Sequence, residues 1–216
     1  MATRPFSLSF LSLLSAAALG CASGGGAASS GETEAQSRAL PLPLAGLAGQ
    51  TVAVLPATML LADEELRWDS LIGEHRAALD RADSLIAASL TQRAPEVTWV
   101  LPPQLRRSAR QAPSLATDPD HLATSVMRDA GMTVLPDPLR SQLRTLVALA
   151  GGSRFVVAPA AIFFKRKDGR GTVELHMVMV DARTGQVQWR SVPKADGDDP
   201  WALLRSALRQ LTPGLP

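Results

Sequence analysis

The chain has 216 residues, 46% of them hydrophobic, which is enough to bury one substantial core. Its formal net charge is only +2, so it lacks the basic excess with which nucleic-acid-binding proteins neutralise phosphates, and we expect no nucleic-acid partner. A single cysteine excludes an internal disulfide.

The first twenty residues have the pattern of a signal peptide. Met1–Arg4 carry one positive charge, and Pro5–Leu19 form an apolar run, rich in Ser and Ala, that is too short to be a convincing membrane span. The run ends in Ala18-Leu19-Gly20-Cys21, which resembles the lipobox of bacterial lipoproteins, although Ala18 stands where Leu is usual. The resemblance implies cleavage of residues 1–20 and acylation of the Cys21 thiol. The alternative is an ordinary secretory signal with an incidental cysteine.

The residue after Cys21 is Ala22 rather than Asp, and by the same resemblance this implies export to the outer membrane of a two-membrane bacterium. Several acyl chains on one residue anchor a protein durably, because each buried methylene contributes about 0.8 kcal/mol. Residues 21–43 begin with a Gly- and Ser-rich stretch and are predicted to form a flexible tether. Residues 44–216 are predicted to form one periplasmic domain.

The domain is predicted to begin with a buried strand at Gly49–Pro56. Asp63 then has the position of an N-cap for one long amphipathic helix that ends near Arg93. A second strand at Val97–Leu101 and a short basic helix at Gln104–Arg110 follow.

Three Asp-Pro pairs divide the rest of the domain, and each fits Asp as N-cap with Pro at the first helical position. They predict helices from Pro119 to about Arg128, over Pro138–Ala150 and over Pro200–Leu211.

Three antiparallel strands are predicted between the last two of these helices, at Phe155–Phe164, Thr172–Val180 and Val187–Trp189. Asp168-Gly169 is a strong hairpin dipeptide, and Gly185 stands where the second loop needs a positive φ. Pro159 has no amide hydrogen, so we expect a bulge or an unpaired position there.

The resulting fold class is α/β, with a mixed sheet and helices packed on its faces. Its parallel strands come from βαβ units, and a C-terminal three-strand antiparallel meander completes it. The segments Val52–Pro56, Leu149–Val157 and Val180–Trp189 resemble their counterparts in a fold family that includes the TolB amino-terminal domain, the curli-transport lipoprotein CsgG and the lipoprotein activators of penicillin-binding proteins. Members of that family assemble or regulate envelope machinery and share no catalytic residues.

The sequence shows no arrangement typical of a catalytic or metal site. His75, His121 and His176 lack metal-ligand spacing to Cys, Asp or Glu, and no nucleophile elbow or phosphate loop is present. The run Asp196–Asp199 fits a helix-capping loop better than a Ca²⁺ site. We therefore expect neither metal nor cofactor, and a protein that is not an enzyme.

Two surface features remain as candidate partner contacts. Lys165, Arg166, Lys167 and Arg170 form a basic hairpin tip, which is either a solvated turn that discourages edge pairing or a contact for anionic lipid, lipopolysaccharide or an acidic partner. Trp68, near the start of the long helix and beside its apolar stripe, is the best candidate for an exposed aromatic contact.

The sequence as a whole favours a lipid-anchored, non-enzymatic periplasmic adaptor or assembly factor that binds an envelope protein. The alternatives are a subunit of an outer-membrane transport complex, as in CsgG, and a hydrolase with an unrecognised site. The partner, its pathway and the oligomeric state are left open.

Overall fold

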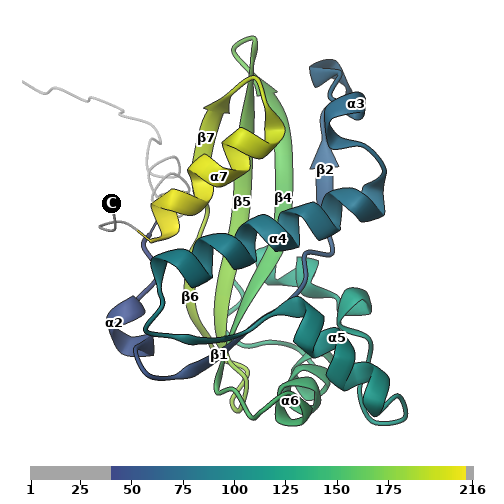
Figure 1. Ribbon diagram of the computed structural model, residues 1–216, viewed down its shortest axis with the longest axis vertical. Coiled ribbons are helices and arrows are strands. Elements are labelled where there is room, and N and C mark those ends of the chain that lie inside the picture. The colour runs from purple at the N-terminus through teal and green to yellow at the C-terminus, as the bar shows by residue number, and fades with distance from the viewer. Residues whose placement is uncertain (1–39, 213–216) are drawn as a thin grey trace, which may run out of the picture.

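A computed structural model describes residues 40–212 and shows a mixed α/β fold (Figure 1). One seven-stranded sheet contains the strands β3 (Thr98–Val100), β1 (Thr51–Val54), β4 (Phe155–Lys167), β5 (Arg170–Asp181) and β6 (Val187–Ser191) in that order, with β2 (Leu60–Ala62) beside β4 and β7 (Lys194–Gly197) beside β5. Parallel pairs join β1 to β3, β1 to β4 and β2 to β4. Antiparallel pairs join β5 to β4, β6 and β7. The predicted fold class is therefore confirmed.

The β4–β5 hairpin contains the two longest strands and runs along the full length of the sheet (Figure 1). At its tip, Asp168 and Gly169 have φ values of +50° and +79°. A two-residue type I′ hairpin turn requires positive φ at both of its central residues. The pairing of β4 with β5 shifts register between Pro159 and Ala161, which confirms the predicted irregularity. Gly185, in the turn before β6, has φ +76° as expected.

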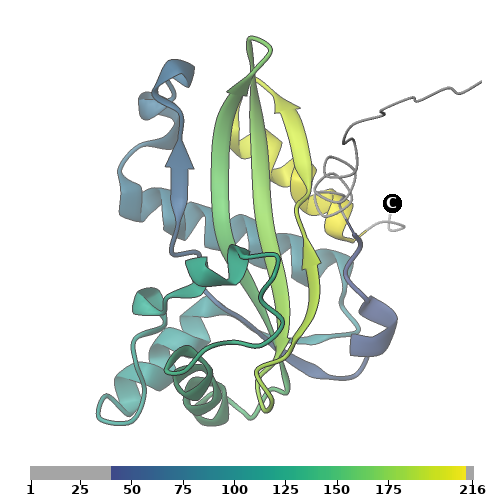
Figure 2. The same cartoon turned by 180° about the vertical axis from the view of Figure 1, so that it is seen from behind.

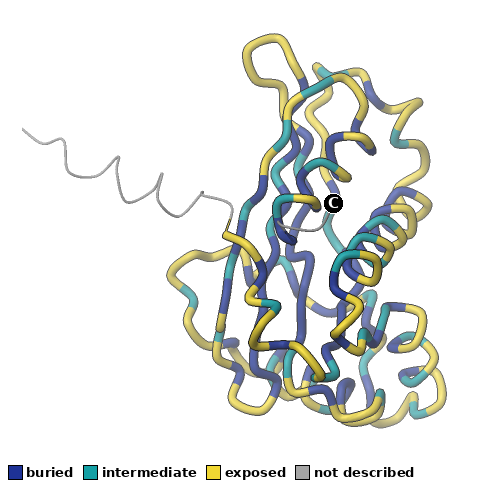
Figure 3. The backbone as a smooth tube through the Cα atoms, turned by 60° about the vertical axis from the view of Figure 1, so that its left-hand side comes forward, coloured by how far each residue is buried: buried dark blue, intermediate teal, exposed yellow. Residues whose placement is uncertain are grey.

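Helices cover the two faces of the sheet unequally. The helices α4 (His75–Arg93) and α7 (Pro200–Leu211) lie on one face, with Val157, Ile162 and Leu175 in their shared core. The helices α5 (Pro102–Gln111) and α6 (Leu139–Leu149) lie on the other. Figure 2 shows that this second layer covers only the half of the sheet that contains β1 and β6, and leaves the half near the hairpin tip without a helix over it. Figure 3 shows the exposed tip above the buried strands.

The domain begins earlier than predicted. Residues 40–43, assigned to the tether from the sequence, contact β6 and α7 just before the short helix α2 (Leu44–Leu47). The amide of Leu40 donates to Ser191 Oγ at 2.9 Å, Trp189 Nε1 donates to the Pro41 carbonyl at 3.0 Å, and the Leu42 amide donates to the Leu211 carbonyl at 2.7 Å. Leu42 is buried in the core, so this segment is part of the domain.

The prediction of one helix from Asp63 to Arg93 is wrong in its first third. The chain instead forms β2, the 3₁₀ turn η1 (Glu64–Leu66) and the short helix α3 (Asp69–Ile72) before α4 begins at His75. Positive φ values at Arg67 (+52°) and Gly73 (+78°) interrupt any continuous helix. Glu74 caps α4 by accepting from the Ala77 amide, whereas the Asp63 carboxylate accepts from the Arg166 amide on β4.

The predicted helix after Pro119 is also wrong, because this segment forms the 3₁₀ turns η2 (Pro119–His121) and η3 (Thr124–Arg128). The side chain of Asp118 accepts from the Asp120 amide and so caps η2. The Met127 carbonyl near the end of η3 accepts from Arg190 of β6. A side chain of the sheet therefore supplies the hydrogen bond that the backbone amide of a next helical turn supplies in a continuous helix. Helix α7 matches its prediction, with Asp199 as N-cap. The predicted cap of α6 is wrong, because α6 begins at Leu139 with Pro138 as its N-cap residue, and Asp137 pairs with Arg140 instead.

Gly171, next to the hairpin tip, marks a close contact that can be tested. A Cβ at this position lies 2.1 Å from Cη2 of Trp68 and 2.9 Å from the Gly197 carbonyl oxygen. We expect Gly171→Ala to lower the free energy of unfolding by about 1–3 kcal/mol, measured by urea denaturation, because the indole must move within a packed core. The control is Gly46→Ala, where a Cβ meets nothing within 4 Å. Equal effects of the two substitutions contradict this prediction.

Candidate functional site

Trp68 is a core residue, so the expectation of an exposed contact at this position is wrong. Its side chain is only 8% exposed and packs edge-to-face on Phe164, with ring centroids 5.8 Å apart. Phe164 in turn packs edge-to-face on Trp201 at 6.3 Å. The cause is the break in the predicted helix, because Trp68 precedes α3 and turns inward over the hairpin rather than along the surface of α4.

The four cations of the basic hairpin tip do not form one surface. Lys165 Nζ pairs with Glu174 Oε2 at 2.5 Å and belongs to the face of the sheet. Arg166 donates to the Glu65 carbonyl at 3.2 Å and so contacts η1. Lys167 and Arg170 are exposed at the tip itself. Partner binding by these residues stays a prediction, and Cys21 lies outside the described residues.

The His and Asp residues considered from the sequence as possible metal ligands do not come together in a metal site. Within residues 40–212, no group of three or more His, Cys, Asp or Glu side chains is placed to hold a metal ion. Asp199 Oδ1 caps α7 by accepting from the Ala202 amide at 2.6 Å, and Asp196 Oδ1 accepts from the Thr172 hydroxyl at 2.6 Å. In the described part of the chain, no helix is both long and apolar enough to cross a membrane.

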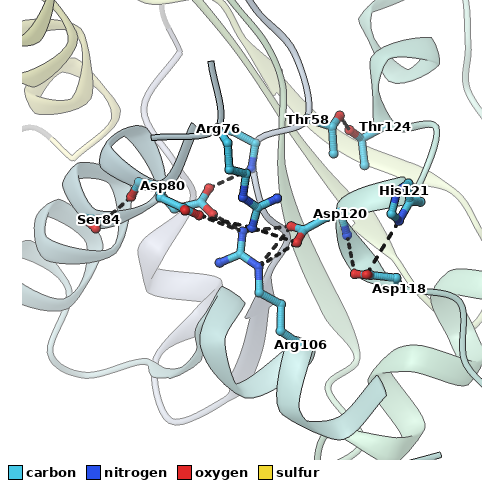
Figure 4. A network of polar contacts seen from close by, with 11 residues as sticks. Thr58, Arg76, Asp80, Ser84, Arg106, Asp118, Asp120, His121 and Thr124 are labelled. Carbon is cyan, nitrogen blue, oxygen red and sulfur yellow. Dashed lines mark hydrogen bonds and ion pairs between the residues drawn. The ribbon is translucent and has the colours of Figure 1, made fainter. Parts of the chain in front are cut away.

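The structure brings together a charged cluster that the sequence did not predict (Figure 4). Arg106 of α5 donates through Nη2 to Asp83 Oδ2 at 2.7 Å and to Asp120 Oδ1 at 2.8 Å. Arg76 of α4 donates to Asp120 Oδ2 at 2.9 Å, and Asp80 Oδ1 lies 3.6 Å from Arg106 Nη2. We call these five residues the Arg106 cluster. It joins α4, α5 and η2.

The charges of the Arg106 cluster compensate one another. Burial raises the pKa of Asp83, against the opposing effects of the Ala57 amide and Arg106. Burial also acts to raise the pKa of Asp120, but hydrogen bonds from Arg106 and Arg76 outweigh it and leave that pKa below its ordinary value. With both oxygens of Asp83 accepting hydrogen bonds, one from the Ala57 amide at 2.7 Å, the arrangement is suited to holding elements together.

A second assembly lies on the part of the sheet that no helix covers, and we call it the open sheet face. Side chains align across four strands in one row, because Leu61 pairs with Phe163, Phe163 with Glu174, and Glu174 with Lys194. The neighbouring positions on the same face and the adjacent turn η3 add further members: Lys165, His176, Val126 and Arg128. Sequence reasoning found Lys165 alone among these as a functional candidate.

Aromatic and charged groups are interleaved on the open sheet face. Phe163 packs edge-to-face on His176, with centroids 5.5 Å apart. The Arg128 guanidinium and Lys165 Nζ each lie 5.4 Å from the Phe163 ring centroid. Glu174 accepts from Lys165 through one oxygen and pairs with Lys194 through the other, at 2.8 Å. Leu61 and Val126 remain 51% and 39% exposed, so apolar surface is left uncovered beside these charges.

The open sheet face is hollowed where it meets η3. A cleft of about 220 Å³ lies between η3, β5, β6 and β7, and the side chains lining it include Met127, Arg128, Glu174, His176, Arg190 and Lys194. Burial lowers the pKa of His176 below its ordinary value; Glu174 opposes this shift, and Arg128, Lys165 and Lys194 reinforce it. The imidazole is therefore neutral at neutral pH, and the permanent charges of the cleft are those of arginine, lysine and glutamate.

Comparison with family models and with curated protein sequences finds no match. Among solved structures, the chain is similar to the LpoB C-terminal domain from Salmonella enterica, at 14% identity and a TM-score of 0.38 over 76% of this chain and 90% of that one. It is also similar to the PelC dodecamer from Paraburkholderia phytofirmans, at 14% identity and TM-score 0.38 over 83% and 96%. A third neighbour is the lipoprotein GNA1162 from Neisseria meningitidis, at 13% identity and TM-score 0.34 over 68% and 79%.

Proposed function

We propose that this chain is a lipid-anchored, non-enzymatic adaptor that binds an envelope protein while Cys21 holds it on the periplasmic side of the outer membrane. The observation that carries the proposal is the open sheet face. Exposed apolar side chains rimmed by charged groups, held on rigid strands, are typical of a protein-binding surface. The lipobox resemblance at Cys21 supports the anchor.

The first described residues and the open sheet face meet at β6. Residues 40–42 are fixed to β6 and to the end of α7 by backbone and side-chain hydrogen bonds. The open sheet face lies on β2, β4, β5 and β7, toward the hairpin tip. Because Ser191 accepts from the Leu40 amide and also lines the cleft, the first described residues border the open sheet face at β6. The β2 and β4 side of the face lies away from them and is left for a partner.

The alternative function, as a subunit of a transport pore, has less support from the fold. Such a subunit needs lipid-facing hairpins in addition to its core sheet. The long hairpin β4–β5 instead supplies residues to both cores, including Val157 and Leu175 on one face and Val156 and Val180 on the other.

The anchor is tested by replacing the cysteine. We expect Cys21→Ser to remain unprocessed or to appear in the soluble periplasmic fraction, because the serine hydroxyl cannot take the place of the thiol that is acylated. Cell fractionation and the mass of the mature protein measure this. Ala22→Ser is the matched control, since it changes a neighbouring residue and keeps the thiol. A correctly trimmed Cys21→Ser protein in the outer membrane contradicts the anchor.

The adaptor function itself is tested in cells by photo-crosslinking from several exposed positions of the full-length protein. We expect the protein with its wild-type Cys21 to capture a defined envelope protein, and the Cys21→Ser variant to capture less of it. If no position captures any envelope protein, the adaptor function is wrong.

A further inference from the structure

Arg190 is an unusual cation, because its charge is partly buried without an ion pair. Both terminal nitrogens of its guanidinium donate to backbone carbonyls, those of Met127 and Met132. Within residues 40–212 no carboxylate lies within 4.0 Å of it, so it takes part in none of the ion pairs there. Burial lowers the pKa of Arg190, and Asp129 opposes that shift from a greater distance. A half-buried arginine held by carbonyls alone favours the approach of an anion.

The surrounding cleft has more cations than carboxylates. Arg128 donates to the Ser125 carbonyl and makes no ion pair among the described residues. Lys194 shares its one partner, Glu174, with Lys165. The cleft lining therefore contains three permanent cations, from Arg128, Arg190 and Lys194, against one carboxylate. Asp129, in an adjoining hollow that shares Arg128 and His176 with the cleft, and Asp196, already bonded to Thr172, reduce the surplus without removing it.

Apolar surface continues directly from this cationic cleft. Leu61 pairs in register with Phe163, and the Phe163 ring lies beside the Arg128 guanidinium. Val126 of η3 is exposed at the border. An inorganic anion satisfies the charges but leaves this apolar row in water. A planar lipid surface that approaches from the tip end of the sheet meets the protruding hairpin tip first (Figure 2). The cleft lies farther along the sheet, beside η3.

We propose that the open sheet face binds an acidic segment of the partner protein, with a carboxylate between Arg128, Arg190 and Lys194 and an adjacent apolar side chain on Phe163 and Leu61. This rests on the adaptor function proposed above and adds to it the chemistry of the partner. Charge complementarity sets the orientation of the segment, and burial of the apolar row supplies affinity.

The test uses the processed, lipidated full-length protein in detergent and a fluorescent peptide in which Glu and Leu alternate. We expect saturable binding that weakens with added salt. Arg128→Glu and Lys194→Glu are each expected to raise Kd at least tenfold, and Leu61→Ala several-fold with little change in salt dependence. Arg205→Glu, an exposed charge reversal on α7 at the opposite face, is the matched control and is expected to leave Kd unchanged. The melting temperature of each variant confirms folding.

Several outcomes overturn the proposal. These are no binding of the Glu-Leu peptide, equal binding of a Lys-Leu peptide, an equal loss in Arg205→Glu, or displacement of the peptide by inorganic phosphate or by phosphatidylglycerol vesicles at comparable concentrations. The last result assigns the cleft to a free anion or to a lipid headgroup.

Crosslinking in cells separates this inference from the adaptor function. A photoreactive residue at Leu61 is compared with one at Leu115, an exposed leucine in the loop after α5. Capture of one defined protein from position 61, lost in Lys194→Glu, supports the inference. Capture from position 115 and not from position 61 leaves the adaptor function standing and shows that the open sheet face is not its binding surface.

Discussion

Replacing Arg106 with methionine is expected to lower the free energy of unfolding by about 3–5 kcal/mol, because it removes the cation that neutralises a buried carboxylate. Asp83 is nearly inaccessible, with a side-chain exposure of 6%, and Arg106 is the side chain that pairs with it. Asp120 keeps Arg76 as a second partner, so the loss falls mainly on Asp83. Urea denaturation at pH 7 measures the effect, since a domain of this size is expected to unfold cooperatively.

The control is Arg107→Met, which makes the same change at the next, exposed position of α5. Its effect is expected to stay within about 0.5 kcal/mol, as for most surface substitutions. A loss below about 1 kcal/mol in Arg106→Met contradicts the structural role of the Arg106 cluster.

The destabilisation is also expected to depend on pH. Burial already raises the pKa of Asp83, and removing Arg106 takes away an effect that lowers it. A carboxyl group whose pKa is higher in the folded than in the unfolded protein gains stability as the pH falls through that folded value. The difference between Arg106→Met and wild type should therefore shrink as the pH is lowered from 7 toward about 4. A difference that is constant over this range shows that lost packing, rather than an unpaired charge, is the cause.

The parts of the fold that the sequence predicted are those set by local backbone chemistry. Asp168-Gly169 and Gly185 specify turns with positive φ, and Pro159 cannot donate to a strand, so the β4–β5–β6 meander follows from nearby residues. Asp199 and Pro200 specify the start of α7 in the same way.

The predictions of the fold that were wrong concern segments whose structure depends on contacts with residues far away in the sequence. Asp63 has the sequence context of an N-cap, yet its carboxylate binds the amide of Arg166, 103 positions along the chain. Strands β2 and β7 were not predicted, and each forms by pairing with a strand of the long hairpin, β2 with β4 and β7 with β5. The segment after Pro119 had helical signals, but one side chain of the sheet, Arg190, donates to the Met127 and Met132 carbonyl groups at its end.

The candidate site was hidden for the same reason. Leu61, Phe163, Glu174 and Lys194 become neighbours only when three separate strand registers are set. The sequence alone does not distinguish Arg190 from an ordinary polar residue, because its special environment forms only when η3 packs against it. Lys165 could be identified because the hairpin tip is a local feature, although its partner Glu174 shows that it serves the face rather than the tip.

Trp68→Ala is expected to lower the free energy of unfolding by about 3–5 kcal/mol, as large-to-small substitutions of buried aromatic residues do. The indole contacts Phe164 edge-to-face and lies over Gly171, so its removal leaves a cavity between α3, the hairpin and α7. Leu115→Ala, at a leucine that is 68% exposed, is the control and should change stability little. Thermal and urea unfolding of the full-length protein measure both variants.

The same variant separates a core residue from a binding residue. If Trp68 acts only through the core, the fraction of Trp68→Ala protein that is folded should capture the partner as well as wild type does. If it is instead a contact, capture falls at temperatures where the variant is fully folded. Unchanged unfolding together with lost capture would restore Trp68 as a surface contact. Since the structure places its side chain against Phe164 and Gly171, we expect the loss to appear in stability alone.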